Sequence, residues 1–207
     1  EWRVEPEAVR LFGRPVGRLN PAQRRVLGLR YVPEQRLGHA AVAGMTLAEN
    51  ASLTDASLRS SRGLNVAKAN DDAARIVQHF RVQAATTAQK IETPSGGNLQ
   101  KFIVGREVLP APRVLLLDQP TWGVDVGSAA SIRNELIALR SAGCAIVIVS
   151  EELDELYQLA DRLMVMSGGR LSRSKAPHEL SVGELGRWMA GFWPAENHRP
   201  ENAEHAT

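Results

Sequence analysis

Short apolar runs and helical spacing alternate along the second half of the chain. The runs at residues 114–117 and 145–149 have the length and composition of buried strands, and a helix is expected between them over about residues 129–140. A further helix, over about residues 98–109, precedes the first run. Strand, helix and strand in this order predict two parallel strands joined by a right-handed crossover. We therefore expect an α/β fold in which helices flank a parallel sheet.

The first half of the chain has a different pattern. A short helix is expected after Asn20-Pro21, a strand over residues 27–32, and another helix opening at residues 45–50. From about residue 52 to 92, apolar side chains recur every three or four positions, which is typical of an amphipathic helix. These apolar residues are Val66, Ala69, Ala73, Ile76, Val77 and Phe80. We interpret this stretch as a helical subdomain.

Shorter elements are expected after residue 150. A helix is predicted over about residues 152–160, followed by a hairpin around Gly168-Gly169. Ser181 and Glu184 have the spacing of a capping box, which predicts the start of a last helix. Residues 194–207 are polar and aperiodic, so a disordered tail is expected there.

Composition excludes several classes of protein. The 25 Lys and Arg residues nearly balance the 23 Asp and Glu residues, and no long run of like charge occurs, so neither a nucleic-acid partner nor a polybasic membrane patch is expected. The longest apolar stretch, Cys144 to Val149, is far shorter than the roughly 20 residues of a membrane-spanning helix. Because Cys144 is the single cysteine, no internal disulfide can form, and a cytoplasmic setting is expected. The first residue is Glu1 rather than Met, which we interpret as an excised or processed product.

Two segments combine residue types that bind phosphate and its metal ion. Ser95, Gly96 and Gly97 come at the predicted start of a helix, where free N–H groups and the helix dipole favour an anion. Asp118 ends the buried run at 114–117, a position from which a carboxylate can hold Mg²⁺ directly or through water. Each segment alone has a plainer interpretation, as a loop before a helix and as the end of a strand. Their joint occurrence favours a nucleotide site.

The chain resembles the ATP-binding-cassette family, specifically the second cassette of bacterial simple-sugar and nucleoside importers. The similarity extends from about Val9 to Gly191 and is carried by five ordered segments. They are Tyr31-Val32-Pro33-Glu34-Gln35-Arg36, Met45-Thr46-Leu47-Ala48-Glu49-Asn50, Ser95-Gly96-Gly97-Asn98, the segment LLLDQPTWGVDVG that contains Asp118 and Asp125, and Val149-Ser150-Glu151-Glu152-Leu153-Asp154-Glu155. The resemblance implies a P-loop core that binds ATP with Mg²⁺.

By that resemblance, each segment has an expected role. Ser95, Gly96, Gly97 and Asn98 would form the signature loop and contact nucleotide. The metal-binding Walker B aspartate would be Asp118. Asp125 would belong to the D-loop, and Glu34 with Gln35 to the Q-loop, all facing the nucleotide. Trp122, beside the D-loop, either packs internally or contacts a partner.

Three departures from the family pattern bear on catalysis. No G-x-x-x-x-G-K-[ST] motif occurs, so the lysine and backbone cradle for the phosphates are missing from this sequence. Gln119 occupies the position of the catalytic glutamate, and its amide lacks useful basicity. Glu151 occupies the position of the switch histidine, where its charge would repel a γ-phosphate. Pro94 also replaces the usual leucine before the signature serine.

The resemblance implies a division of labour between two cassettes packed head to tail. This cassette would supply its signature to ATP held by the partner cassette, while its own site would be degenerate and the isolated chain inactive. Further expected partners are membrane permease subunits and, indirectly, an extracytoplasmic solute-binding protein, with the ATPase at the cytoplasmic face of the inner membrane. Two alternatives remain: a non-transport cassette ATPase acting on nucleic acid or the ribosome, and a degenerate regulatory cassette.

The resemblance also divides the chain into four segments. Residues 1–33 would be a remnant of the nucleotide-binding core, and residues 34–97 would comprise the Q-loop and the helical subdomain with its signature loop. Residues 98–193 would form the RecA-like core with Walker B, D-loop and switch region. The last segment is the expected disordered tail, residues 194–207.

Overall fold

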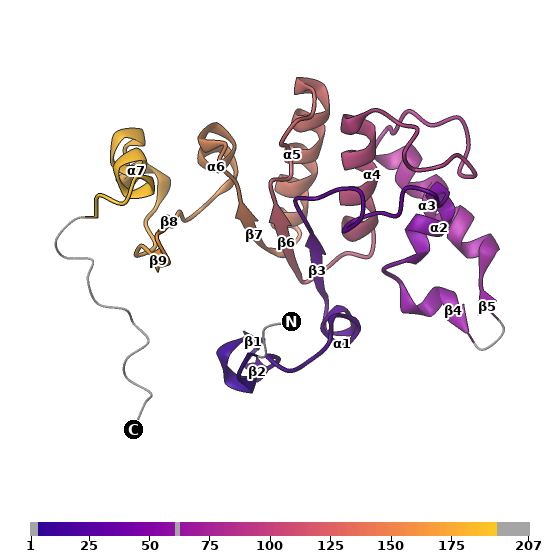
Figure 1. Cartoon of the computed structure of the whole chain (residues 1–207), viewed down its shortest axis with the longest axis horizontal. Helices are drawn as coiled ribbons and strands as arrows, with labels where there is room; N and C mark the ends of the chain where they lie inside the picture. Colours follow the sequence, from indigo (N-terminus) through magenta and orange to yellow (C-terminus); the bar gives the residue numbers. More distant parts are fainter. Residues whose placement is uncertain (1–3, 61–62, 194–207) are drawn as a thin grey trace. The chain divides into compact units, whose positions relative to one another are not determined.

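The computed structural model describes residues 4–60 and 63–193 (Figure 1). The chain divides into two compact units, residues 1–151 and residues 152–207, and each is treated by itself below. The expected disordered tail at 194–207 lies outside the described residues.

A three-stranded parallel sheet is the centre of the first unit. Its strands are β3 (Leu29–Val32), β6 (Val114–Asp118) and β7 (Ala145–Val149), in the order β3-β6-β7. Both pairings are parallel, with Leu29 opposite Val114 and Val114 opposite Ala145. The α/β architecture expected from the apolar runs is therefore confirmed.

Helix α5 (Val126–Ser141) is the crossover between β6 and β7. It begins three residues before the predicted start because Asp125 caps it: the Asp125 carboxylate accepts a hydrogen bond from the backbone N–H of Ser128 at 2.9 Å. The buried positions of α5 include Ala129, Ile132 and Leu136, whose spacing of three and four residues forms one apolar face.

Helix α4 (Gly96–Val108) packs against several elements of the first unit, namely β3, α3 and α5 (Figure 1). Because it is covered on more than one side, ten of its residues are buried and it lacks a strong amphipathic pattern. The three consecutive residues Phe102, Ile103 and Val104 are completely buried. Three consecutive residues point to different sides of a helix, so a helix with one broad solvent-exposed face could not bury all of them. The packing of α4 therefore determines the position of its first residues, which belong to the predicted signature loop.

The expected helical subdomain contains two α-helices, α2 (Leu47–Ser52) and α3 (Val66–His79), which pack against each other. Between them lie a 3-10 turn (Ala56–Leu58) and a short hairpin of β4 (Arg59–Ser60) and β5 (Gly63–Leu64). The region from 52 to 92 is thus less helical than its periodicity predicted. Helix α3 stops at Phe80, and Arg81 then adopts a left-handed φ of 49°, which ends the helical path.

The elements before the sheet are short. A 3-10 turn (Pro6–Ala8) and the hairpin of β1 (Arg10–Leu11) and β2 (Arg14–Pro15) precede α1 (Pro21–Val26). Helix α1 begins as predicted, with Asn20 and Gln23 forming a reciprocal capping box.

The second unit is built around a small core of its own. Its elements are α6 (Leu153–Leu159), β8 (Met166–Ser167), β9 (Arg170–Leu171), a 3-10 turn (Pro177–Glu179) and α7 (Val182–Met189). The predicted hairpin and the Ser181–Glu184 capping box are both present. The buried residues of its hydrophobic core cluster are Leu163, Val165, Leu180, Leu185 and Trp188.

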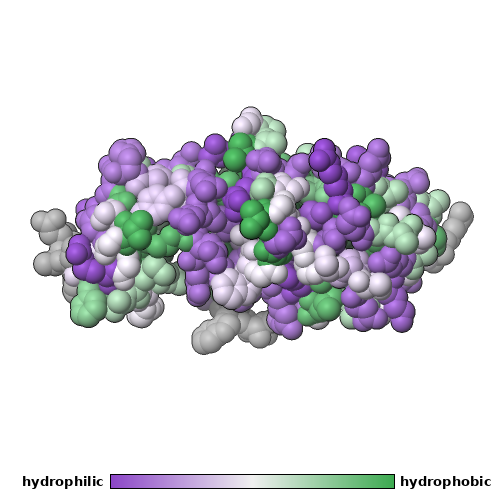
Figure 2. Space-filling view, turned by 90° about the horizontal axis from the view of Figure 1, so that it is seen from above, coloured by the Kyte–Doolittle hydropathy of each residue, from purple (hydrophilic) through white to green (hydrophobic). Residues whose placement is uncertain are grey.

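Hydrophilic residues cover most of the face shown in Figure 2, and hydrophobic residues occur there in small groups. Across residues 4–60 and 63–193, no helix combines the length and the apolar composition needed to cross a bilayer.

Candidate functional site

The carboxyl ends of the three parallel strands bring acidic side chains to one edge of the sheet. Asp118 ends the central strand β6 and is partly exposed, while Glu34 follows β3 and Glu151 follows β7, both exposed. Burial raises the pKa of Tyr31, and the nearby charges of Asp118 and Glu34 raise it further. Ligands of open parallel sheets bind at this edge. The structure therefore places the predicted Walker B, Q-loop and switch positions on one side of the sheet.

Gln119 and Glu151 meet directly after their strands. The backbone N–H of Gln119 donates to Val149 O at 2.8 Å, and its side-chain Oε1 accepts from the backbone N–H of Glu151 at 3.4 Å. Gln119 has a left-handed φ of 50°, a conformation that costs a non-glycine residue free energy and needs support from its surroundings. These two contacts supply that support. The amide of Gln119 thus joins the turn after β6 to the segment after β7.

The predicted signature segment, residues 95–98, lies at the amino end of α4. Ser95 and Gly96 are exposed, whereas Gly97 is buried. Ser95 Oγ makes no capping bond to the helix and instead accepts from Asn98 Nδ2 at 3.0 Å. Asn98 Oδ1 accepts from the backbone N–H of Gln83 at 2.9 Å, which ties this turn to the loop after α3. Because the first helical N–H groups have no intrahelical acceptors, the exposed start of α4 can receive an anion.

Gly97 is needed for the close approach of α4 to α5. A Cβ at this position would lie 2.5 Å from Asp125 Oδ2 and 2.6 Å from Ser128 Oγ. Both atoms belong to the cap of α5, in which Ser128 Oγ donates to Asp125 Oδ2 at 2.7 Å. The side-chain and backbone hydrogen bonds from Ser128 hold the pKa of Asp125 below its ordinary value. The Asp125 carboxylate is thus engaged in capping, a role that its Asp-x-x-Ser spacing could have indicated.

Arg36 links three predicted site segments through hydrogen bonds. The sequence did not indicate this role of Arg36. Its Nε donates to Gln100 Oε1 on α4 at 3.0 Å, and its Nη2 donates to Trp122 O in the loop after β6. Gln100 Nε2 in turn donates to Pro120 O at 2.9 Å. Trp122 itself is 54% exposed, so it does not pack inside the first unit. No local sequence pattern predicts the Arg36–Gln100 hydrogen bond, because the two residues are 64 positions apart.

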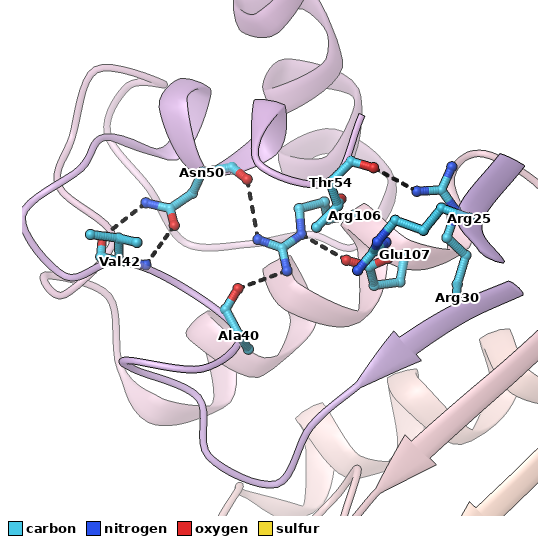
Figure 3. Close-up of polar contacts among 8 residues, drawn as sticks. All are labelled: Arg25, Arg30, Ala40, Val42, Asn50, Thr54, Arg106 and Glu107. Atoms are coloured by element: carbon cyan, nitrogen blue, oxygen red, sulfur yellow. Dashed lines mark hydrogen bonds and ion pairs between the residues drawn. The ribbon is translucent and has the colours of Figure 1, made fainter. Parts of the chain in front are cut away.

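A buried polar cluster anchors the other end of α4 (Figure 3). Arg106 donates to Glu107 Oε1, to Asn50 O and to Ala40 O, at 3.0, 3.1 and 2.7 Å. Arg25 of α1 donates to the other Glu107 oxygen at 2.6 Å. Burial lowers the pKa of Arg106, and the charge of Glu107 opposes that shift. The cluster holds α4 against α1, α2 and the segment after β3, and so fixes the helix that carries the predicted signature segment.

A metal ion would not find a complete ligand set among the side chains of residues 4–60 and 63–193. In the part of the chain that the structure describes, no group of three or more His, Cys, Asp and Glu side chains is placed to hold a metal. Asp118 offers a single carboxylate at the sheet edge. This donor set fits Mg²⁺ that takes most of its ligands from phosphate oxygens and water, which is the usual arrangement for this ion.

Comparisons with known proteins agree with the geometry. A ribose import ATP-binding protein of Rhizobium meliloti is 34% identical over 191 residues, which are 92% of this chain and 38% of that protein. A xylose import ATP-binding protein of Burkholderia ambifaria is 39% identical over 165 residues, 79% of this chain and 32% of that protein. A putative ribose/galactose/methyl galactoside import ATP-binding protein of Agrobacterium fabrum is 35% identical over 188 residues, 90% of this chain and 38% of that protein. The chain therefore spans less than two fifths of the length of these relatives.

Among solved structures, the fold resembles a dimeric ATP-binding cassette in a post-hydrolysis state bound to ADP and Pi. The TM-score is 0.65 at 17% identity, over 81% of this chain and 72% of that one. No protein-family model matches the chain. The sheet and its helices thus have the fold of a P-loop nucleoside triphosphatase. With the import ATP-binding relatives, this shows that the chain belongs to the ATP-binding-cassette family, as its motifs indicated.

Proposed function

We propose that this chain is part of an ATPase that energises import of a simple sugar, and that it supplies its signature segment to ATP bound by a partner cassette. One observation carries the proposal: Ser95 and Gly96 are exposed at the start of α4, where the first helical N–H groups have no intrahelical acceptors and Ser95 makes no side-chain cap. The relatives support the transport role, since they are ribose and xylose import ATP-binding proteins.

The negative charge at the chain's own sheet edge makes that edge a poor site for ATP hydrolysis. Glu151 and Glu34 place acidic groups on the same edge as Asp118, where they repel a triphosphate. Gln119 has no basic group, and its Oε1 already accepts a hydrogen bond from Glu151 N. Loss of a general base lowers a rate by roughly 10²–10⁴. Hydrolysis is therefore assigned to the partner's site.

ATP and Mg²⁺ are the substrate and ion that this proposal requires. Asp118 is the residue that would hold Mg²⁺ at this chain's own edge, directly or through water. Ser95, Gly96 and Gly97 would meet phosphate oxygens of the nucleotide held across the junction, through the Ser95 hydroxyl and the first amides of α4. The remaining predicted contacts, Asn98, Asp125 and the Glu34–Gln35 pair, stay part of the proposal.

The proposed assembly contains a second cassette packed head to tail and membrane permease subunits, with a solute-binding protein acting through the permease. The ATPase would then work at the cytoplasmic face of the membrane. Which sugar is transported is decided by the permease and the solute-binding protein, because a cassette site contacts nucleotide rather than cargo.

Two substitutions test the division of labour in the assembled transporter. Ser95→Arg places a large side chain over the exposed start of α4 and should abolish ATP-driven sugar uptake. Gln119→Ala should have a mild effect, since the residue is not the base of the active site. Equal loss of uptake in both variants would contradict the asymmetry between the two cassettes.

Nucleotide binding by the 207-residue chain without a partner is a second test of the proposal that the partner cassette holds the ATP. A titration with a fluorescent ATP analogue should show no saturable binding below about 1 mM, a limit that corresponds to roughly 4 kcal/mol of affinity. Tight binding of nucleotide by the chain alone would show that it holds ATP itself.

A further inference from the structure

One guanidinium joins the three loops on which the proposed function depends. Arg36 lies directly after Glu34 and Gln35, and it contacts α4 through Gln100 and the loop after β6 through Trp122 O. Gln100 extends the link to Pro120 O. The three segments, residues 34–41, 95–100 and 118–123, otherwise come from distant parts of the sequence.

The guanidinium also lies next to the signature glycines. A Cβ added at Gly96 would lie 3.2 Å from Arg36 Nη1, which is tighter than an ordinary van der Waals contact, so the guanidinium lies close against this glycine. The backbone around Arg36 is itself held, because its carbonyl accepts from Ala41 N at 2.8 Å. Burial lowers the pKa of Arg36, yet an arginine stays charged near neutral pH. Arg36 is therefore a charged side chain that donates several hydrogen bonds, and its backbone is held in place by the hydrogen bond from Ala41 N.

We propose that Arg36 is a positioning residue that ties the orientation of the signature segment to the loops after β3 and β6. A guanidinium suits this role because its planar fork donates to several acceptors at once, whereas an ammonium group has no such fixed geometry. A displacement of the loop after β3 would then be transmitted to Gly96 and to Trp122 together. This inference rests on the proposed function, because it concerns how the signature is held for a partner's ATP.

Hydrogen exchange in the 207-residue chain tests the link directly. Arg36→Ala should speed exchange of the hydrogen-bonded amides within residues 96–100 and 120–124, among them Leu99 and Trp122, by about tenfold, as expected for loss of hydrogen bonds from a charged donor. Arg36→Lys keeps the charge without the fork and should give a smaller increase in both segments. Gln100→Ala combined with Arg36→Ala should give less than the sum of the two single effects, since both substitutions remove the Arg36–Gln100 hydrogen bond.

Arg30→Ala is the matched control. Arg30 is also a partly buried arginine whose pKa is lowered by burial, and it also donates to a main-chain carbonyl, Thr54 O at 2.8 Å, but it lies within β3. It should leave exchange at 96–100 and 120–124 unchanged. Faster exchange in only one segment after Arg36→Ala, or the same change after Arg30→Ala, would overturn the inference.

Kinetics of the assembled transporter separate this inference from the proposed function. Arg36→Ala should lower kcat for ATP hydrolysis by about tenfold and leave KM for ATP unchanged, because the partner holds the nucleotide. If Ser95→Arg abolishes hydrolysis while Arg36→Ala behaves like Arg30→Ala, the positioning role is wrong and the proposed function stands. If Ser95→Arg has no effect, the proposed function is wrong and this role falls with it.

Discussion

Gly105 lies where α4 meets α3, and enlarging it by one methyl group tests how tightly helix α4 is held. A Cβ at Gly105 would lie 2.6 Å from Phe80 Cδ2, 2.8 Å from Ile76 Cγ2 and 2.9 Å from Phe80 Cε2. Both neighbours are 1% exposed, so the Phe80 ring cannot move aside into solvent. Gly105→Ala should therefore force α3 and α4 apart.

The size of the effect follows from two opposing contributions. Overpacking of a filled core costs about 1–3 kcal/mol. Alanine in place of glycine inside a helix returns roughly 1 kcal/mol through its higher helix propensity. Since two of the clashing atoms belong to a fixed aromatic ring, the upper half of the packing range applies, and a net loss of about 1–2 kcal/mol is expected.

Gly186→Ala in α7 is the control, because a Cβ there would meet nothing within 4 Å. It is the same chemical change inside a helix and should stabilise its own unit by up to about 1 kcal/mol. Urea titration with pulsed hydrogen exchange separates the units: the midpoint for α4 peptides should fall by roughly 0.5–1 M in Gly105→Ala. An unchanged or higher midpoint for α4 in that variant would refute the packing argument.

Two further predictions concern stability and pH. Glu107→Gln leaves the buried Arg106 and the adjacent Arg25 without their carboxylate, so it should lower the free energy of unfolding by about 3 kcal/mol or more in urea titrations; a loss below about 1 kcal/mol would contradict that role. The Asp125 carboxyl has a folded pKa below its unfolded value, so its capping contribution is complete above about pH 4 and is lost as pH falls through the folded pKa. Ser128→Ala removes the hydroxyl donor and should move the Asp125 pKa upward in an NMR titration, and an unmoved pKa would show that the Ser128 hydroxyl does not lower it.

Local signals predicted much of the fold. The apolar runs at 114–117 and 145–149 gave the strands β6 and β7, because buried parallel strands are nearly continuous in hydrophobic residues. Capping residues such as Asn20 and Ser181 marked helix starts correctly, since a cap acts only within one turn. The meeting of Asp118 and Glu151 at one edge also follows from parallel strand order alone.

Periodicity overestimated the helix content of residues 52–92. The spacing of Val66, Ala73 and Phe80 is real, but the chain leaves the helix at Arg81 with a left-handed φ of 49°. Nothing in the apolar spacing signals that turn, because it is determined by contacts between the loop after α3 and α4. Lys101 Nζ, for example, donates to Arg81 O at 2.9 Å.

Contacts between distant segments could not be predicted. The approach of Gly97 to the Asp125 cap and of Gly105 to Phe80 depends on how α4 is seated against α5 and α3. The Arg36–Gln100 hydrogen bond likewise requires the chain to return after 64 positions. Sequence motifs named the candidate site residues, whereas the connections that hold them appear only in three dimensions.

The central claim is that the exposed start of α4 closes on ATP held by another cassette. The most direct measurement is binding of the partner cassette to the immobilised 207-residue chain, with a non-hydrolysable ATP analogue and Mg²⁺, with ADP, or without nucleotide. We predict saturable binding only with the ATP analogue, and its loss in Ser95→Arg. Binding that is equal in all three conditions, or that persists in Ser95→Arg, would contradict the account.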